Sequence, residues 1–570
     1  MAILSASAPV GRLRRLRRSP VTRGAALSLI AIVHVAALVI MAATEVDLVA
    51  KAAFLLGWAL INFFWLALFR RPTVAALTSL EFVVALILLS QFKHDKLLMT
   101  VDFVDLMIID QDTSAFLLTA IPSLRVPITL AAMATAVLLA GAWLLDPFRL
   151  RARTIVIGGS LSMGALVTLS LSFPTDLDED FIGQNYISKF ARTGVEAIHE
   201  FIIHGYLESD ASVTERLKVT SAASCNVSRK LPHIILLHDE SSFDITAAPG
   251  MKVPPDYRRY FQSFDGKARK LVVEGASGPS WFTEYNVLTG LSARSYGRFA
   301  TSVTRIAAGH VARGLPHSLN RCGYTTFTLY PFYGSFLGSR AFQTTTGIER
   351  YLDVHDLGTR SFEPDSFYFR QATKIIRRER SYGPLFLYVY NVANHFPWDT
   401  RLRPELTPDW RDLGNAPSID EYIRRQGMTA HDYGELLERL RQEFSTESFL
   451  IVRYGDHQPE FGHRVIDPSL SPQAVARHLE ALDPRYFTTY YAIDAVNFTP
   501  ADLSSALDKL DAPYLPLVVQ EAAGVPLGPT FSEQKEILKR CHGLFYRCAG
   551  GAEARRFNRL LIEAGLIKGL

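Results

Sequence analysis

The stretch GASGPSWFTEYNVLTGL, residues 275–291, organises the chain. It begins with a turn of small residues, Gly275 to Pro279, and continues with Ser280 and a run of apolar residues at helical spacing. Proline and serine are common where a helix begins, and the free N–H groups of a helix N-terminus stabilise an alkoxide or a phosphate. The stretch therefore predicts a helix that begins near Ser280. A capped helix behind such a turn is common in proteins of every function. Whether Ser280 has a functional role must therefore be judged from the rest of the chain.

The first 172 residues contain five apolar runs, each long enough to cross a bilayer, which takes about 20 residues. We place the runs at Ala25–Ala43, Ala52–Phe69, Thr73–Phe92, Pro127–Leu145 and Thr154–Ser172. The 570 residues, of which 48% are hydrophobic, leave room for one or two further domains.

Arginines are concentrated on one side of these runs. They lie at Arg12 to Arg23 before the first run, at Arg70 and Arg71, and at Arg149 to Arg153. By the positive-inside rule these segments are cytoplasmic, so five crossings place everything after about Phe173 outside. The first run lacks a small-residue cleavage site before Glu45, so we interpret it as an anchor and not as a signal peptide.

The external loop from Lys93 to Arg125 contains VDFVDLMIID, residues 101–110. Its amphipathic pattern favours a segment that lies on the membrane surface, and a plain connector is the alternative.

All four cysteines lie in the external half: Cys225, Cys322, Cys541 and Cys548. An even number outside the membrane predicts two disulfides, for which three pairings are possible. We favour Cys225–Cys322, because each precedes a strand-like run, and Cys541–Cys548, because the two are neighbours in sequence. No Cys/His pattern of a zinc finger is present.

From residue 231 onward, short apolar runs alternate with helical patterns. The runs are HIILLH, KLVVEG, TTFTLY, LFLYVYN, FLIVRYGD and FTTYYAI. This alternation predicts an α/β domain with a buried, mostly parallel sheet and helices on both faces. Residues 173–230 are predicted as a linker with a helix around Ile187–Tyr206, and residues 532–570 as a helical extension.

Polar residues follow three of the predicted strands: Asp239–Glu240, Asn394–His395 and Asp456–His457. Ligands of an open α/β sheet sit beyond the carboxyl ends of the strands, so we expect these groups and Ser280 at one rim. Two carboxylates, an imidazole and a hydroxyl suit one divalent metal ion, which is manganese, magnesium or zinc. Such an ion would favour the alkoxide of Ser280 and make it a nucleophile at neutral pH.

Four motifs in order resemble the alkaline phosphatase/sulfatase superfamily, and within it the membrane-anchored lipoteichoic acid synthase-like phosphoglycerol transferases. The motifs are Glu240–Ser241, SWFTEYNVLTGL, NHFPW and YGDH, and the resemblance spans about Leu231–Phe498. It implies that Glu240, Asp456 and His457 bind the metal and that Ser280 is both nucleophile and fourth ligand. It also implies that His395 and Arg340 contact the substrate phosphate, although Arg340 has an alternative interpretation as a surface residue.

Three positions depart from that family pattern. The nucleophile in this group is usually Thr, so Thr283, one helical turn after Ser280, is the fallback nucleophile. A family His expected near Tyr330–Tyr333 is missing, and Phe332 stands there. Asp239, where the group is often apolar, is expected to add a ligand or a supporting acid.

The resemblance implies a metal-dependent transferase that moves a phosphoglycerol-type head group from a phospholipid donor, through a phospho-serine, to a glycan or lipid acceptor. The alternatives are a phosphoethanolamine transferase, a phosphodiesterase or sulfatase-like hydrolase, and an inactive scaffold in envelope assembly. A Cys/Ser-x-Pro-x-Arg sulfatase signature is absent after Ser280. We expect no nucleic acid partner.

The predicted organisation follows the chain from inside to outside. It comprises a cytoplasmic basic N-terminus (1–24), a five-helix transmembrane domain (25–172), the linker (173–230), the catalytic domain (231–531) and the helical extension (532–570). The expected location is a bacterial inner membrane, crossed several times, with the catalytic domain on the periplasmic or extracellular side.

Overall fold

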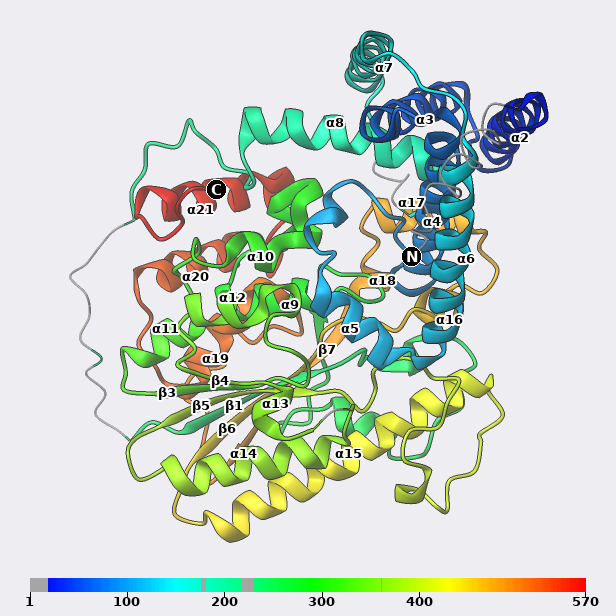
Figure 1. The fold of residues 1–570 in the computed structure, drawn as a ribbon. Coiled ribbons are helices and arrows are strands. Elements are labelled where there is room, and N and C mark those ends of the chain that lie inside the picture. Colours follow the sequence, from blue (N-terminus) through cyan, green and yellow to red (C-terminus); the bar gives the residue numbers. More distant parts are fainter. Residues whose placement is uncertain (1–18, 176–180, 218–224, 226–229, 360) are drawn as a thin grey trace, which may run out of the picture. The chain divides into compact units, whose positions relative to one another are not determined.

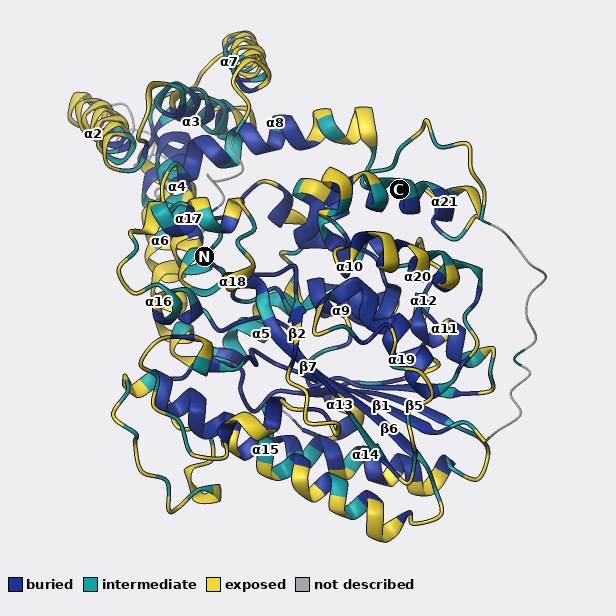
Figure 2. Cartoon of the chain, turned by 180° about the vertical axis from the view of Figure 1, so that it is seen from behind, coloured by how far each residue is buried: buried dark blue, intermediate teal, exposed yellow. Residues whose placement is uncertain are grey.

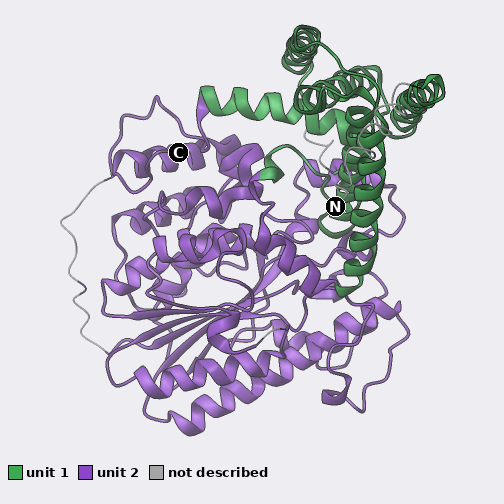
Figure 3. Ribbon diagram, viewed as in Figure 1, with its two compact units in different colours: residues 1–106, 122–203 green, residues 107–121, 204–570 purple. Residues whose placement is uncertain are grey.

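The computed structural model describes the chain except for residues 1–18, 176–180, 218–224, 226–229 and 360. The chain forms two compact units, residues 1–106 with 122–203 and residues 107–121 with 204–570 (Figure 3). Arg12 to Arg18 and parts of the predicted linker lie outside the described residues. The predicted domain boundaries stay predictions.

Five helices of the chain are long and apolar enough to cross a membrane, which confirms the predicted number among the described residues. They are α2 (Pro20–Thr44), α3 (Leu48–Phe69), α4 (Pro72–Leu97), α6 (Arg125–Leu145) and α7 (Ala152–Ser172). Figure 2 shows extensive exposed faces on α2 and α6, and the exposed side chains there are mostly apolar. A hydrocarbon surrounding suits such faces, because exposed large apolar surface is rare in water. Helix α8 (Tyr186–His204) follows, close to its predicted position.

The second unit is built on an eight-stranded sheet in the order β4-β3-β5-β1-β6-β7-β2-β8. The strands are β1 (His233–Asp239), β2 (Arg269–Val272), β3 (Thr325–Leu329), β4 (Arg350–Leu352), β5 (Leu385–Asn391), β6 (Phe449–Gly455), β7 (Thr488–Val496) and β8 (Lys509–Asp511). Strand β7 runs antiparallel to both neighbours, and the other pairs are parallel. The predicted α/β fold is confirmed. The edge strands β4 and β8 were not predicted, because three residues are too few to show a pattern.

Helices cover both faces of this sheet (Figure 1). Helices α14 (Asp365–Glu379) and α15 (Pro417–Glu443) lie on one face, and α9 (Ser280–Thr289), α11 (Leu315–Asn320) and α19 (Leu515–Ala523) lie on the other. Every residue of β1, β5 and β6 is buried (Figure 2). Strands enclosed on both faces need continuous apolar runs, which explains the unbroken HIILL and FLIV sequences.

The remaining helices of the second unit are shorter or peripheral. They are α5 (Gln111–Ala120), α10 (Val303–Ala307), α12 (Ser339–Thr345), α13 (Val354–Leu357), α16 (Gly462–Ile466), α17 (Pro472–Glu480), α18 (Pro484–Phe487), α20 (Pro529–Cys541) and α21 (Ala552–Glu563).

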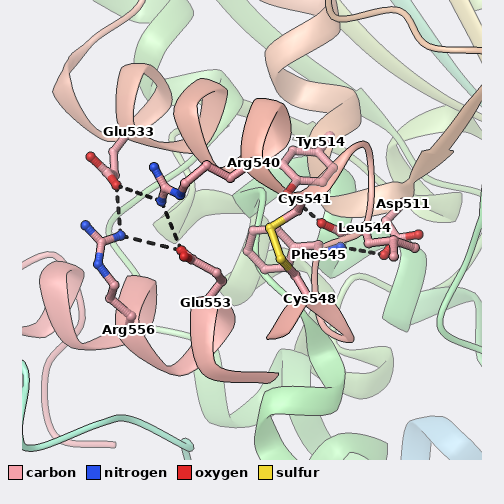
Figure 4. The surroundings of a disulfide bond; sticks show 10 residues. All are labelled: Asp511, Tyr514, Glu533, Arg540, Cys541, Leu544, Phe545, Cys548, Glu553 and Arg556. Atoms are coloured by element: carbon pink, nitrogen blue, oxygen red, sulfur yellow. Dashed lines mark hydrogen bonds and ion pairs between the residues drawn. A yellow bond between two sulfur atoms is a disulfide. The ribbon is translucent and has the colours of Figure 1, made fainter. Parts of the chain in front are cut away.

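Two disulfides join the cysteines in the favoured pairing, Cys225–Cys322 and Cys541–Cys548. Figure 4 shows the second one between α20 and the turn before α21. Beside it Glu533 and Glu553 alternate with Arg540 and Arg556 in a ring of ion pairs, with N–O distances from 2.9 to 3.7 Å. The C-terminal helices are therefore held to each other by a covalent link and by charge.

We expect the two disulfides to contribute unequally to stability. Cys225–Cys322 spans 97 residues and Cys541–Cys548 spans 7. Closing a longer loop removes more entropy from the unfolded chain, so losing the first bond should cost about 4–5 kcal/mol and losing the second about 2–3 kcal/mol. Thermal unfolding of the two paired Cys→Ser variants measures the difference. Equal losses would contradict the expectation, and non-reducing peptide mapping of the wild type provides the control.

Candidate functional site

The carboxyl ends of the three central strands lie level with one another. Asp239 at the end of β1 pairs with Asn391 of β5 on one side and with Gly455 of β6 on the other. The next residues are therefore delivered to one rim: Glu240 after β1, and Asp456 and His457 after β6. The position is the one expected for the ligand site of an open α/β sheet.

Ser280 reaches this rim from the first residue of α9. Its Oγ lies 3.1 Å from Glu240 Oε2 and 3.2 Å from His457 Nε2. His457 Nε2 in turn lies 3.2 Å from Glu240 Oε1 and 3.4 Å from Asp456 Oδ2. Three distant segments of the sequence thus bring a hydroxyl, two carboxylates and an imidazole within contact distance.

The donor set fits a cation. The carboxylates of Glu240 and Asp456 are buried, with 3% and 0% of each residue exposed. Among the described residues, none of their hydrogen-bond or ion-pair partners is Lys or Arg. Buried carboxylates are stable only with a compensating positive charge, and a divalent ion bound by these oxygens and by His457 would supply it.

His238 is a member of this cluster that the sequence analysis did not assign. It lies in β1, and one ligand atom each of His238, Glu240 and Asp456 lies within 4.8 Å of the others. The Tyr454 hydroxyl contacts His238 Nδ1 at 2.8 Å, and His238 Nε2 contacts Asp456 Oδ2 at 3.1 Å. A carboxylate only accepts, so Nε2 carries the proton when Asp456 is ionised and the imidazole orients that carboxylate. Its place in an apolar strand, HIILLH, hides this role in the sequence.

The charges in the cluster shift the pKa values of its members. Burial raises the pKa of Glu240, but the hydrogen bond from His457 and the positive charge of that imidazole outweigh it and lower the pKa. Burial lowers the pKa of His457, but Asp456 and Glu240 raise it to about 9. Because the pKa of Glu240 is lowered and that of His457 is raised, the cluster is most stable with Glu240 ionised and His457 protonated. A metal ion that bound His457 would therefore displace a proton from it.

The backbone around the donors is tightly constrained. Ser241, directly after Glu240, has a φ of 51°, and its N–H donates to Asp456 Oδ1 at 2.7 Å. A Cβ on Gly455 would lie 1.8 Å from the carbonyl oxygen of Ser242. Only glycine permits this approach, so Gly455 sets the distance between the turns that carry Glu240 and Asp456.

The two hydroxyl candidates are in different surroundings. The Thr283 side chain is buried, and its Oγ1 donates to the backbone oxygen of Asp456 at 2.6 Å. Ser280 is partly exposed and contacts the donors through its side chain. Thr283 therefore joins α9 to the turn after β6, and Ser280 is the hydroxyl that a substrate can reach.

Two other predicted residues lie outside this contact network. Arg340 Nη2 binds Asp353 at 2.7 Å and Asp356 at 3.3 Å, and among the described residues no hydrogen bond or ion pair joins it to Ser280 or its partners. Asp239 accepts hydrogen bonds from Asn391, Tyr260 and Tyr490. Asp239 is therefore engaged by residues of the core.

His395 is held by its loop and by Arg425. The His395 Nδ1–H donates to the Phe396 oxygen at 2.7 Å, because a carbonyl only accepts, and this leaves Nε2 as an acceptor. Arg425 donates to the carbonyl oxygens of His395 and Pro397, at 2.7 Å each. Burial lowers the pKa of His395, so its imidazole is neutral at pH 7.

Aromatic rings surround His395. Phe362 and Phe396 lie 4.7 and 4.3 Å from it between ring centroids, and Phe332 lies 5.9 Å away. Phe332 lies, with Pro331, in the stretch near Tyr330–Tyr333 where the resemblance led us to expect a His. The pattern of the chain gave no signal for this aromatic wall, because its members come from separate loops.

The wall also includes Phe116 of α5, from the loop between the third and fourth apolar runs. Its ring centroid lies 4.5 Å from that of Phe336, 5.0 Å from Phe332 and 5.9 Å from His395. Asp110 caps α5 through the Thr113 N–H and forms an ion pair with Arg305 of α10. The predicted amphipathic stretch forms only a short 3-10 helix at Val104–Met107, and α5 follows it as part of the second unit.

We expect Phe116→Ala to raise KM about three- to tenfold and to change kcat less. An aromatic pair contributes ~0.5–1.5 kcal/mol beyond its buried area, and Phe116 touches the wall but none of the donor residues. Steady-state kinetics with a lipid donor measures the split. Phe264→Ala, at a half-exposed Phe elsewhere in the unit, is the matched control. An unchanged KM would show that α5 is not part of the substrate site.

We expect the buried Asp365 to make stability fall as pH rises. Asp365 Oδ1 accepts from the N–H groups of Val392 and Ala393, which begin the His395 loop, and burial raises its pKa from 3.8 to about 7. The folded state therefore binds this proton between about pH 4 and 7 while the unfolded chain has lost it, so the free energy of unfolding decreases through that window.

Asp365→Asn removes this titration. The stability of the Asn variant relative to wild type should grow between pH 5 and 8 by at most about 3 kcal/mol, because the raised pKa of about 7 lies about two pH units above pH 5. Thermal unfolding at both pH values measures the change. Parallel pH profiles for the two proteins would contradict the prediction.

One family model matches part of the chain. Residues 276–485 match the sulfatase family model, which confirms the resemblance to the alkaline phosphatase/sulfatase superfamily. The matched segment contains Ser280, His395, Asp456 and His457, while Glu240 lies before it. A sequence search of curated proteins finds no match.

Three solved structures that resemble this chain are distant from it in sequence. The Streptococcus pyogenes phosphoglycerol transferase GacH is 15% identical, with 61% of this chain and 89% of that chain covered and a TM-score of 0.46. The Neisseria meningitidis lipooligosaccharide phosphoethanolamine transferase A is 11% identical, with coverages of 74% and 86% and a TM-score of 0.44. The Listeria monocytogenes lipoteichoic acid synthase LtaP is 14% identical, with coverages of 57% and 73% and a TM-score of 0.38.

Proposed function

From a sulfatase-family domain joined to five potential membrane-spanning helices, we propose that the protein transfers a phosphorylated head group from a phospholipid to a glycan or lipid. The observation that carries the proposal is the position of Ser280. Its hydroxyl begins α9 and contacts both Glu240 and His457. A hydroxyl at a helix N-terminus, beside a cation site, is arranged to attack phosphorus.

Glu240, Ser280, Asp456 and His457 would hold one divalent ion, which is manganese, zinc or magnesium. When bound, the ion would lower the pKa of the Ser280 hydroxyl and polarise a phosphoryl oxygen. The chain's own residues prepare the site for it: His238 orients the Asp456 carboxylate, and the Ser241 N–H holds the other oxygen of that carboxylate.

The proposed reaction has two displacements at phosphorus. In the first, Ser280 Oγ forms a bond to the head-group phosphorus, the bond to the diacylglycerol oxygen breaks, and diacylglycerol leaves with the proton of Ser280. In the second, an acceptor hydroxyl attacks the phospho-serine, and Ser280 regains a proton. The Nε2 of His395, which carries no proton in the neutral ring, would take the proton of the acceptor hydroxyl, and general-base assistance of this kind contributes ~10²–10⁴-fold.

We favour phosphoglycerol as the transferred group, and phosphoethanolamine is the main rival. The sequence after β1, DESSFD, lacks the Glu-Thr-Ala-Arg-like motif of phosphoethanolamine transferases. Hydrolysis of a sulfate ester is disfavoured, because Ser280 is not followed by the sulfatase Pro and Arg. An inactive scaffold is disfavoured, because such a protein would have no reason to bury two carboxylates against a nucleophile.

We also propose that the second unit lies outside the cytoplasm of a bacterium, beside the inner membrane. The arginines between the spans support this orientation, as do the two disulfides of the second unit. A site outside the membrane that acts on phospholipid explains why one chain contains both the spanning helices and the α/β unit.

Mass spectrometry of the intact protein tests the proposal. The full chain is incubated with phosphatidylglycerol or phosphatidylethanolamine and with each candidate metal, and the adduct is located by peptide mapping. We expect a glycerol-phosphate mass on Ser280 with phosphatidylglycerol. An ethanolamine-phosphate mass would establish the rival donor, and diacylglycerol release without any adduct on Ser280 would overturn the mechanism.

A further inference from the structure

The first unit contains an apolar cavity of about 480 Å³ among α3, α4, α7 and α8. Its walls include Leu60 and Ile61 of α3, Phe82 of α4, and Met163 and Val167 of α7. The volume lies within the range of ~300–1,000 Å³ that is typical of ligand pockets. Among the described lining residues, His199 alone has a polar side chain.

The apolar stripe of α8 forms one complete wall. The residues of α8 that line the cavity recur at helical spacing: Ile187, Phe190, Ala191, Gly194, Val195, Ile198 and Ile202. Small residues let α8 approach its neighbours closely at two points. A Cβ on Gly57 would lie 3.3 Å from the Ala191 Cβ, and a Cβ on Gly194 would lie 3.0 Å from the Phe103 ring. Because α8 already lies this close to α3 and to Phe103, it has no room to move closer, and a small shift of the helix does not close the cavity.

The shape and chemistry of the cavity select a long apolar ligand. The lining extends along α7 from Met163 to Leu171, which is about 12 Å at 1.5 Å per residue. Water needs two to four polar partners in a cavity and would find none along this wall. The stripe of α8 continues into exposed residues, with Ile198 57% and Ile202 75% exposed. Three of the helices that line the cavity, α3, α4 and α7, are long and apolar enough to cross a membrane, so a lipid is the apolar ligand expected beside them.

We propose that this cavity binds an acyl chain of a membrane glycerophospholipid, with His199 at the polar end of the lipid. The proposal deepens the proposed function and rests on it for one point, that the bound lipid is the donor. The five-helix unit would then select and hold the lipid substrate in addition to anchoring the chain.

A photoreactive lipid tests the proposal on the full chain in nanodiscs. The probe is phosphatidylglycerol with a diazirine on one acyl chain, and labelled peptides are mapped after irradiation. Val195→Trp on α8 and Val167→Trp on α7 fill the cavity from two different helices, so a folding defect in one leaves the other as a test. Val137→Trp, at a 72% exposed position of α6, is the matched control.

We expect the wild type and Val137→Trp to be labelled mainly on α7 and α8, and the two cavity variants to lose about tenfold of that labelling. A tenfold loss corresponds to ~1.4 kcal/mol of binding. Equal labelling in all four proteins, or labelling spread evenly over the exposed helix faces, would overturn the proposal.

Ser280→Ala separates this proposal from the proposed function. It should keep full labelling of α7 and α8 while forming no head-group adduct. If Ser280→Ala instead turns over normally, the transfer mechanism fails but the acyl-chain site stands. If adducts form as expected while the cavity variants label like the control, the acyl-chain site fails and the mechanism stands.

Discussion

Ser280→Ala should abolish head-group transfer, with a loss of about 10⁴-fold or more in turnover, the scale seen when a covalent nucleophile is removed. The reason is geometric: Ser280 is the partly exposed hydroxyl that contacts Glu240 and His457. The measurement is release of diacylglycerol from fluorescent phosphatidylglycerol, together with the mass of the intact enzyme. The variant should show no adduct and should still bind metal through its remaining donors.

Two companion variants make this result specific. Thr283→Ala should keep adduct formation and lose about 1–3 kcal/mol of stability, because it leaves the backbone oxygen of Asp456 without its hydrogen bond. Ser280→Thr should retain measurable transfer, because it keeps a hydroxyl at the same position. If Ser280→Ala turns over normally while Thr283→Ala is inactive, the nucleophile lies one helical turn farther along α9.

The double variant Ser280→Ala with Asp456→Asn tests whether the residues act as one unit. Effects within a catalytic unit are strongly non-additive, so the double variant should be little worse than either single variant. Asp456→Asn should also lower metal occupancy. Multiplicative losses would show that the two residues contribute to separate steps.

Gly455→Ala should remove metal binding and activity together, although it changes no donor atom. Its Cβ would lie 1.8 Å from the Ser242 oxygen, a backbone atom that cannot rotate away. The strands must therefore separate, and Asp456 and His457 move away from Glu240. A misplacement of about 1 Å can cost ~10²-fold in rate, so we expect a loss of at least about that size.

Metal content by elemental analysis and diacylglycerol release measure the effect. Gly434→Ala is the matched control: Gly434 is an exposed residue of α15, and a Cβ there meets nothing within 4 Å. This control should keep full activity and gain about 0.5–1 kcal/mol, because alanine favours a helix more than glycine does. Full metal content in Gly455→Ala would show that the turn tolerates the change.

Local patterns in the sequence predicted most elements of this fold and most residues of the candidate metal site. Five long apolar runs can satisfy their backbone only as helices in lipid, and short apolar runs between helical patterns can be buried only as a sheet. Glu240, Asp456 and His457 were predicted because they follow such runs directly, and parallel strands end at one edge. The order of four motifs gave the resemblance to the alkaline phosphatase/sulfatase superfamily, and the sulfatase family model matches residues 276–485.

The tertiary structure alone decided what depends on contacts between distant segments. His238 looks like part of an apolar strand, and only the pairing of β1 with β6 brings it to Asp456. Arg340 has a basic side chain that suits phosphate, but the fold gives it Asp353 as a partner. Phe116 lies between two apolar runs and reaches His395 only through the docking of α5. Such contacts leave no periodic trace in the sequence, because helices and strands repeat locally and the approach of two loops does not.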